Sequence, residues 1–373
     1  MTNPLAPAPG SARATVADPS LLGLGTALPA RMLDRDEALD LAVRRCATGA
    51  RQAAILERLY RRTAIDTRGV CLAPDERHLS PFYPAEIAAA PTTARRMERF
   101  ELLAPPLAER ACARALSDAV VPAATITHLI VVTCTGFAAP GLEIALVRRL
   151  GLPANVARVQ LGFMGCHGAI AALRLARSIA SADPATRVLV CAVELCSLHF
   201  QYGWRADQLV CNALFADGAA AAVVGRATPG DATWRLRSSR SHVIDDTIHA
   251  MGWHIGDHGF VMTLSSEVPG ILGGVVGPWV DAWLSEHGTD RAEIGAWAIH
   301  AGGPRIVRSV AGSLGLNDGH LAASFDVLRR AGNMSSATIL FILEALRRQG
   351  TRPTVALAFG PGLTAEALLL TAG

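Results

Sequence analysis

A cysteine between glycines is the residue of this chain best suited to covalent chemistry. Cys166 lies in the segment LGFMGCHGA, where the flanking glycines allow a sharp turn and let a substrate approach the backbone. A helical pattern begins directly after it, so unpaired N–H groups and the positive end of the helix dipole should favour a thiolate and bind a carbonyl oxyanion. The segment therefore indicates a nucleophile for acyl groups, with a merely buried thiol as the alternative.

A histidine and an asparagine occupy comparable positions further along the chain. His300 ends an apolar strand before Ala-Gly-Gly-Pro, and Asn333 opens a helix within AGNMSSA. Considered without the cysteine, the histidine would be interpreted as a structural residue and the asparagine as a helix N-cap. With a cysteine that takes an acyl group from a thioester, both could instead donate hydrogen bonds to a thioester carbonyl as it becomes an enolate. The three residues together predict a decarboxylative condensation in which malonate supplies the carbon nucleophile.

The elements that must position these residues alternate between strands and helices. Short apolar runs rich in β-branched residues predict buried strands, and longer runs with apolar residues at helical spacing predict helices between them. This alternation indicates an α/β fold in which helices cover a sheet. The predicted strands are 127–134, 187–195, 219–225, 295–302 and 354–360, and the clearest predicted helices are 169–180 and 336–349.

Two segments of the chain also echo one another. GCHGAIAALRLARS from Gly165 and GNMSSATILFILEALRR from Gly332 both pass from a turn of small residues straight into a helix. The echo indicates a duplicated βα unit whose two helix N-termini face one central site. We predict a flexible tail at 1–18, an N-terminal half with the nucleophile at 19–235, and a C-terminal half with His300 and Asn333 at 236–373, divided within the polar segment 226–240.

The composition excludes several classes of protein. The 373 residues carry a formal charge of +3 spread along the chain, which gives no reason to expect a nucleic acid partner. No apolar run is long enough to span a bilayer, and the N-terminal stretch lacks the apolar centre of a signal peptide. The eight cysteines include no CxxC pair. We therefore expect a soluble cytoplasmic protein without disulfides or a bound metal.

Four segments carry a resemblance to a known family. LGFMGCHGA, IHAGGP (299–304), GNMSSA (332–337) and above all FGPGLTAE (359–366) are similar to the signature segments of chalcone and stilbene synthases and their bacterial relatives, the type III polyketide synthases. The similarity covers nearly the whole chain after the tail. It implies a thiolase-like αβαβα layered fold built from two duplicated halves, a homodimer, and iterative use of an acyl-CoA starter and malonyl-CoA without a carrier protein or further cofactor.

The resemblance also implies individual roles. Cys166 matches the residue that loads the acyl group, while His300 and Asn333 match the pair that promotes decarboxylation and stabilises the oxyanion. Phe215 matches an aromatic gatekeeper, although without the motif it would be read as core packing. Met262 replaces the family's second aromatic gatekeeper with a flexible side chain. The remaining positions that line the family's cavity correspond to Cys134, Thr135, Cys196, His199, Trp253 and Ser335.

A group of arginines could bind the phosphates of CoA. Arg58, Arg61 and Arg62 cluster in LERLYRRTAIDTR, and Arg58 and Arg62 fall where the family has basic residues for CoA. Arg305, after the Gly-Gly-Pro turn, could join them. The alternative is an ordinary solvated helix face.

Two other functions share some of this pattern. A ketoacyl-ACP synthase III also has Cys, His and Asn but performs a single condensation, and FGPGLTAE argues against it. A non-catalytic acyl-binding protein of the thiolase fold would be expected to lack one of the three residues. We therefore predict a type III polyketide synthase. The replacement at Met262 and segments such as MGWHIGDHGF favour an aliphatic starter such as a fatty acyl-CoA and a pyrone or resorcinol-type phenolic product.

Overall fold

The computed structural model describes residues 18–72, 82–227, 233–350 and 352–372. The strands are β1 (Ser20–Ala27), β2 (Arg31–Asp34), β3 (Thr67–Val70), β4 (His128–Thr133), β5 (Ala157–Gly162), β6 (Arg187–Leu195), β7 (Asp217–Gly225), β8 (Trp234–Val243), β9 (Met251–Gly256), β10 (Gly259–Leu264), β11 (Ala296–Ile299), β12 (Thr354–Gly360) and β13 (Thr364–Ala372). The helices are α1 (Arg35–Cys46), α2 (Ala50–Arg62), α3 (Thr93–Asp118), α4 (Leu142–Leu150), α5 (Gly168–Ala182), α6 (Ala206–Leu214), α7 (Val268–Ser285), α8 (Pro304–Leu314), α9 (Asp318–Ala331) and α10 (Thr338–Arg347). No helix within these residues is long and apolar enough to cross a membrane.

One sheet of nine strands runs through the molecule in the order β11-β12-β13-β8-β1-β7-β6-β4-β5. Its two halves meet where β1 pairs with β8, and within the described residues two pairs, Ser20 with Arg235 and Leu21 with Trp234, join them. In each half, parallel strands continue into antiparallel ones: β5, β4 and β6 are parallel before β7, and β11 and β12 are parallel before β13. The sheet is therefore two similar sheets in contact at one corner.

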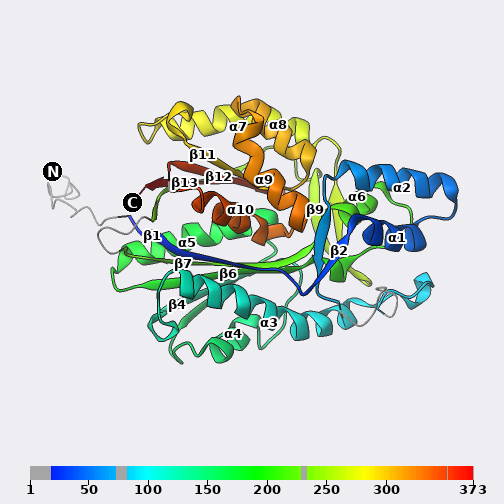
Figure 1. Ribbon diagram of the computed structural model, residues 1–373, viewed down its shortest axis with the longest axis horizontal. Coiled ribbons are helices and arrows are strands. Elements are labelled where there is room, and N and C mark those ends of the chain that lie inside the picture. The colour runs from blue at the N-terminus through cyan, green and yellow to red at the C-terminus, as the bar shows by residue number, and fades with distance from the viewer. Residues whose placement is uncertain (1–17, 73–81, 228–232, 351, 373) are drawn as a thin grey trace, which may run out of the picture.

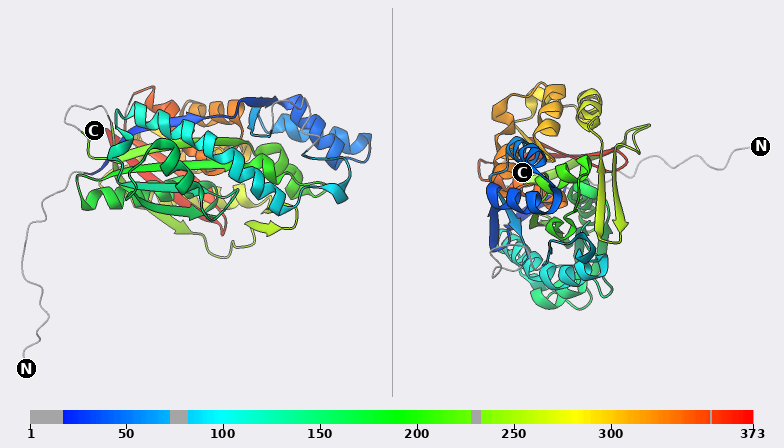
Figure 2. Two further views of the ribbon diagram at one scale, coloured as in Figure 1. Left: turned by 90° about the horizontal axis from the view of Figure 1, so that it is seen from below. Right: turned by 90° about the vertical axis from the view of Figure 1, so that its right-hand side faces the viewer.

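Helices form three further layers around these two sheets (Figure 1). Helix α3 packs on the outer face of β1, β7 and β6, and α4 packs on α3. Helices α5 and α10 lie between the sheets and contact strands of both. Helices α7 and α8 pack together over the second sheet, and Figure 2 shows the same stacking from two other directions. The predicted αβαβα fold with duplicated halves is confirmed, since a 3-10 turn leads into each central helix, η3 (Gly165–His167) before α5 and η6 (Ser335–Ala337) before α10.

Small residues make this layering possible. Strand β7, DGAAAAVVG, is buried along its whole length because helices cover both of its faces. On β1, a Cβ atom at Gly23 would approach the Ala115 carbonyl oxygen to 2.4 Å, and one at Gly25 would approach the Ala115 nitrogen to 2.3 Å. Helix α3 therefore packs directly against the backbone of β1, which no larger residue at these positions would permit.

The structure refines the expected division of the chain. Within the polar segment 226–240, which was predicted to separate the halves, β8 begins at Trp234 and pairs along its length with β13. A strand forms there because its polar residues alternate with buried ones such as Leu236. Residues 1–17 of the predicted tail lie outside the described residues. Asp18 is described, and it pairs with Arg177 and Arg237.

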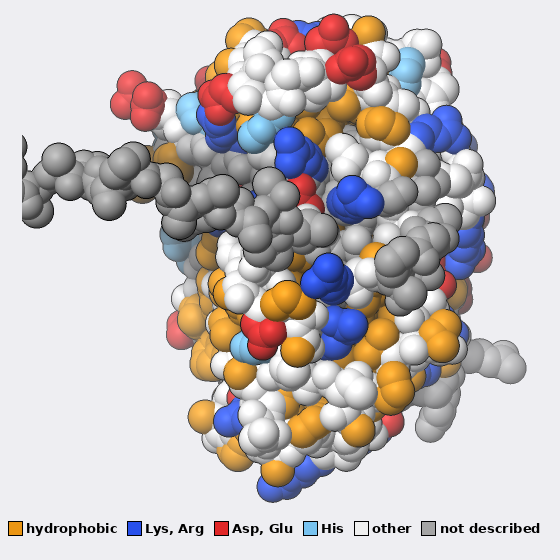
Figure 3. Space-filling view, turned by 90° about the vertical axis from the view of Figure 1, so that its left-hand side faces the viewer, with side chains coloured by type: hydrophobic (Ala, Val, Ile, Leu, Met, Phe, Trp, Pro, Cys, Tyr) orange, Lys and Arg blue, Asp and Glu red, His pale blue; other side chains and the backbone are white. Residues whose placement is uncertain are grey.

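A smaller lobe made by α1, α2, α6, the two-stranded sheet of β2 and β3, and the β9–β10 hairpin extends beyond one end of the sheets (Figure 1). Basic side chains gather on the opposite end of the molecule, where β1 begins (Figure 3). Surface charge by itself therefore does not single out the lobe of α1 and α2 as the place where phosphates bind.

An exposed valine should limit the stability of α3. Val120 follows the C-cap with a left-handed φ of 52°, a conformation that is unfavourable for a β-branched residue. Its side chain is 87% exposed, so buried contacts do little to offset this cost. We expect Val120→Gly to raise the free energy of unfolding by about 1 kcal/mol, because glycine adopts this conformation without the Cβ penalty. Chemical denaturation measures the change. The reverse substitution at the C-cap of α4, Gly151→Val, should lower stability, since Gly151 has a φ of 64°.

Candidate active site

The turn that carries Cys166 is held against the turn between β12 and β13. Gly165 has a φ of 75°, and a Cβ atom there would meet Pro361 Cδ at 2.3 Å. Glycine is therefore required both by the backbone conformation and by the close approach. The Cys166 side chain lies just below the surface, since the residue is 8% exposed. A substrate must enter a pocket to reach the sulfur.

Burial decides the protonation state of Cys166. Desolvation raises the pKa of the thiol to about 12, and hydrogen bonds from the Ser335 and Asn333 side chains only partly oppose it. The helix dipole predicted a lowered pKa and a thiolate, whereas the pKa is raised. The cost of placing a thiolate in an apolar pocket outweighs the electric field at the helix N-terminus. In the free protein the nucleophile is a thiol that must lose its proton to a nearby base.

Asn333 is fixed by its backbone as well as by its side chain. Its N–H donates to the Leu214 carbonyl oxygen at 3.0 Å, and its carbonyl oxygen accepts from Ala216 N–H at 2.9 Å. The side-chain Oδ1 accepts from Ser335 N–H at 2.9 Å, so the amide nitrogen is the group left to face Cys166. The N-cap of α10 is Ala337 rather than Asn333, so the capping alternative does not describe this residue.

His300 lies at the end of the second sheet, close enough to the His167 ring for the two to interact electrostatically, although it is not among the residues that line the Cys166 pocket. It directly follows β11, and its N–H donates to the Leu357 carbonyl oxygen of neighbouring β12 at 2.8 Å. The residue is 2% exposed, and neither ring nitrogen has a hydrogen-bond partner in the described part of the chain. Burial lowers the pKa of His300 to about 3, with repulsion from the His167 ring adding to the shift. A neutral imidazole with free nitrogens can donate one hydrogen bond and accept another.

Two site residues escaped the sequence analysis. His167 follows the nucleophile, and its Nε2 lies 2.8 Å from Thr364 Oγ1, which ties the turn to β13. Glu194 is fully buried and accepts hydrogen bonds from Cys134 N–H at 2.9 Å and from the hydroxyl groups of Thr135 and Ser336. It therefore joins the segment after β4 to η6. The histidine was visible in GCHG, whereas nothing in the sequence around Glu194 marks a buried carboxylate.

The pocket at Cys166 contains most of the predicted cavity residues. The aromatic side chain of Phe215 and the thioether side chain of Met262 both border it. The other predicted residues that line it are Cys134, Thr135, Cys196, Trp253 and Ser335, and the structure adds Gly165, Met251 and Pro361. The seven predicted side chains come from both halves of the chain and meet around the sulfur.

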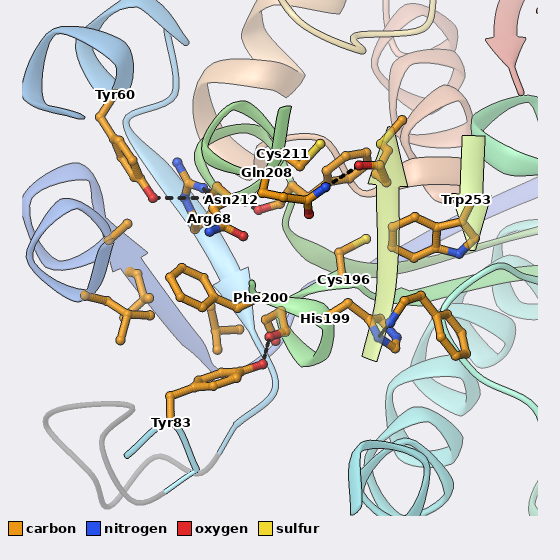
Figure 4. Close-up of a pocket in the computed structure, with 18 residues that line it drawn as sticks. Tyr60, Arg68, Tyr83, Cys196, His199, Phe200, Gln208, Cys211, Asn212 and Trp253 are labelled. Carbon is orange, nitrogen blue, oxygen red and sulfur yellow. Dashed lines mark hydrogen bonds between the residues drawn. The ribbon is translucent and has the colours of Figure 1, made fainter. Parts of the chain in front are cut away.

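A second space, which we call the deep chamber, adjoins this pocket (Figure 4). It shares Cys196, Phe215, Trp253 and Met262 with the Cys166 pocket. Its remaining lining residues are Leu33, Ala38, Leu41, Tyr60, Arg68, Val70, Tyr83, Ser197, His199, Phe200, Gln208, Cys211, Asn212 and Phe260. The four shared side chains therefore form the partition between the two spaces.

His199 lines the deep chamber rather than the Cys166 pocket. Its Nε2 lies 2.7 Å from the Thr135 carbonyl oxygen, and its Nδ1 accepts from Phe260 N–H at 2.9 Å. Because both nitrogens are engaged, the ring is held neutral in one tautomer and offers only its face to a ligand. Burial lowers its pKa to about 3, in agreement with this arrangement.

The β9–β10 hairpin supplies two side chains of the partition and is firmly held. Trp253 and Met262 are cross-strand partners, so their side chains share one face of the hairpin. Trp253 Nε1 donates to the Cys134 carbonyl oxygen at 2.7 Å, and Gln208 Nε2 donates to the Met262 carbonyl oxygen. These contacts place Met262 at the boundary that a chain growing on Cys166 would meet.

The three arginines predicted to bind CoA are exposed. Arg58 and Arg62 lie on α2 and Arg305 in the first turn of α8, and none of them forms an ion pair with another described residue. Arg61, between the first two, pairs with Glu57 at 2.8 Å. A Cβ atom at Gly303, which precedes α8, would lie 3.5 Å from Leu214, the residue before Phe215. The start of α8 thus packs against the end of α6, while the role of Arg305 stays a prediction.

The layered fold and the buried cysteine define a thiolase-like acyltransferase. Residues 10–229 match the model of the N-terminal domain of chalcone and stilbene synthases, and residues 235–372 match that of the C-terminal domain. The chain therefore belongs to the chalcone and stilbene synthase family and is a type III polyketide synthase, a transferase that catalyses decarboxylative Claisen condensation. This membership sets it apart from the single-condensation synthases that share its three residues.

Relatives of known sequence and structure agree with this membership. The alpha-pyrone synthesis polyketide synthase-like Pks18 of Mycobacterium tuberculosis is 35% identical over 93% of this chain and 89% of its own. The 1,3,6,8-tetrahydroxynaphthalene synthase of Streptomyces peucetius is 34% identical over 98% of this chain and 97% of its own. The crystal structure of PKS-I from the brown alga Ectocarpus siliculosus superposes with a TM-score of 0.91 at 28% identity, covering 97% of this chain and 100% of that one.

Proposed function

We propose that this protein extends a fatty acyl-CoA starter with malonyl-CoA and releases a pyrone or resorcinol-type product. The observation that carries the proposal is the mostly apolar deep chamber that adjoins the Cys166 pocket across Cys196, Phe215, Trp253 and Met262. An acyl chain attached to Cys166 could extend into it and bury apolar surface. The similarity to a relative named for alpha-pyrone synthesis supports the choice of product class.

Loading begins with the thiol of Cys166. The sulfur attacks the carbonyl carbon of the starter thioester, and His300, which is neutral and has both nitrogens free, passes the thiol proton to the departing CoA sulfur as the new S–C bond forms and the old one breaks. The acyl group is now a thioester on Cys166. The site is buried, so water has little access to hydrolyse this intermediate.

Chain extension uses the side chains of His300 and Asn333 as hydrogen-bond donors. Malonyl-CoA loses its carboxylate as carbon dioxide, and the bonding electrons form an enolate whose oxygen His300 and Asn333 stabilise. The enolate carbon attacks the thioester carbonyl, the Cys166 sulfur leaves as a thiolate, and the chain returns to CoA two carbons longer. The thiolate can take the chain back for another round, with Phe215 between the entrance and the growing chain.

The substrates would be held by arginines at the entrance. If Arg58 and Arg62 contact CoA phosphates, the double variant Arg58→Ala, Arg62→Ala should raise the KM for malonyl-CoA roughly tenfold with a smaller change in kcat, because contacts remote from the reacting carbon stabilise ground and transition states alike. Steady-state kinetics at two salt concentrations tests this. Arg61→Ala is the matched control, since Arg61 already pairs with Glu57, and an unchanged KM in the double variant would place the entrance elsewhere.

We also propose that the chain acts as a homodimer in the cytoplasm. Edge strand β5 is largely exposed, and Phe137 and Phe163 close to it are exposed aromatic side chains whose rings lie 6.4 Å apart. A second copy would cover such an edge. All eight cysteines are free thiols, which suits a reducing compartment. Light scattering that gives the mass of a single 39.1 kDa chain would contradict the dimer.

The decisive experiment supplies malonyl-CoA with acyl-CoAs of increasing length and identifies the products by mass spectrometry. We expect pyrones or alkylresorcinols that retain the starter chain, with medium and long chains used in preference to acetyl-CoA. Products limited to a single condensation would contradict iterative extension. Exclusive use of short or aromatic starters would contradict the fatty acyl assignment and leave the family membership intact.

A further inference from the structure

The deep chamber contains one charged side chain. Of the described residues that line it, most are apolar or aromatic, and Arg68 is the only one with a formal charge. Figure 4 shows Tyr60 and Trp253 at opposite ends of the chamber and Arg68 on the Tyr60 side. The residue is 4% exposed, and its guanidinium lies 5.4 Å from the centre of the Tyr60 ring. A buried cation therefore faces a space that is otherwise suited to an acyl chain.

The protein leaves one hydrogen-bond donor of this guanidinium without a partner. Arg68 Nη1 donates to the Asn212 carbonyl oxygen at 3.1 Å and more weakly to the Phe215 carbonyl oxygen at 3.4 Å, and Nη2 donates to the Ala213 carbonyl oxygen at 2.8 Å, all at the end of α6. Its buried Nε–H has no hydrogen-bond partner, and no carboxylate among the described residues pairs with the guanidinium. Burial lowers the pKa of Arg68, which reflects the same lack of a counter-charge.

The other polar groups around the chamber are engaged. Gln208 Nε2 donates to Met262 O, Asn212 Nδ2 donates to Gln201 O at 2.7 Å, and Tyr83 donates its hydroxyl to Ser197 O. Arg68 therefore holds the clearest unused donor at this space. A ligand that filled the chamber with a methyl group would leave this donor buried and unpaired.

We propose that the deep chamber binds the far end of the starter acyl group and that Arg68 selects a starter that ends in a hydrogen-bond-accepting oxygen, a carboxylate above all. This inference rests on the proposed function and narrows its substrate class from a fatty acyl-CoA to an ω-oxygenated one. An anionic oxygen would give the guanidinium the charge-assisted hydrogen bond that the protein does not provide. Chains too short to reach Arg68 gain nothing from it.

The test compares ω-carboxyacyl-CoAs, from adipoyl to hexadecanedioyl, with methyl-ended acyl-CoAs of the same length. Turnover is measured as kcat/KM with malonyl-CoA, and binding is measured by calorimetry on the Cys166→Ala protein. We expect no preference for the shortest pair and at least a roughly tenfold preference for the carboxylate in longer pairs, in both measurements. A preference for the methyl-ended chain at every length would overturn the proposal.

Two arginine variants assign the effect. Arg68→Met should abolish the preference, and Arg68→Lys should retain some of it. Arg96→Met is the matched control, because Arg96 is also buried, stacks on Tyr83 at 5.5 Å and donates to the Phe200 carbonyl oxygen, yet does not line the chamber. An equal loss in both Met variants would overturn the role of Arg68. If Arg68→Met does not fold, the wild-type length series still decides. If no acyl-CoA is extended, the proposed function fails, and the binding preference still tests Arg68.

Discussion

Replacing Cys166 with alanine should reduce chain extension at least ~10⁴-fold while leaving measurable decarboxylation of malonyl-CoA. Extension requires a sulfur that holds the acyl group, and the substitution removes it. Decarboxylation needs only the donors that stabilise the enolate, and these lie after β11 and before η6, outside the turn of Cys166. The two activities should therefore separate in this variant. Release of carbon dioxide and formation of extended products measure them independently.

Peptide mapping after incubation with a starter acyl-CoA completes this test. The wild-type protein should carry the acyl adduct on Cys166, and Cys166→Ala should carry none. Cys134 and Cys196 line the same pocket and serve as internal comparisons. In Cys134→Ala the adduct should still form on Cys166, because Cys134 Sγ is occupied as the acceptor of Gly165 N–H at 3.0 Å. A stable adduct on either of the other two thiols would overturn the assignment of the nucleophile.

Replacing His300 with alanine should slow decarboxylation by about 10²–10³-fold, the usual cost of losing one oxyanion donor in a dry site. His300→Gln should recover some of this loss, since an amide can donate to the enolate but cannot carry the thiol proton. Loading of Cys166 should therefore stay slow in His300→Gln. Equal losses of loading and decarboxylation in both variants would point to a structural role for the ring.

The pH dependence of the wild-type protein gives a separate check. Because the pKa of His300 is lowered to about 3, the imidazole is charged only below that pH and neutral throughout the range in which the enzyme would be assayed. Decarboxylation should therefore show no inflection near the ordinary histidine pKa of about 6.5. A rate that falls as the pH drops through 6.5 would show that His300 titrates there, contrary to its buried, uncharged state.

Local sequence patterns determined the elements and the segments that carry the site. The short apolar runs at 187–195 and 354–360 became β6 and β12 with the same bounds, because a short, mostly apolar run is best buried as a central strand of a covered sheet. The small-residue turns before α5 and α10 were likewise readable, since glycine at positive φ and close packing leave few alternatives at Gly165. These features depend on neighbours in the chain.

The tertiary structure decided what depends on residues far apart. The thiol state of Cys166 follows from desolvation, which no local pattern reports. The engaged nitrogens of His199 depend on Thr135 and Phe260, and only folding shows that Arg68 lacks a carboxylate among the described residues at the deep chamber. The sequence by itself therefore determined the chemistry that the chain carries. Burial and long-range contacts decided which groups are charged, which donors are free and how much space the acyl chain has, because these quantities are sums over residues that only the fold brings together.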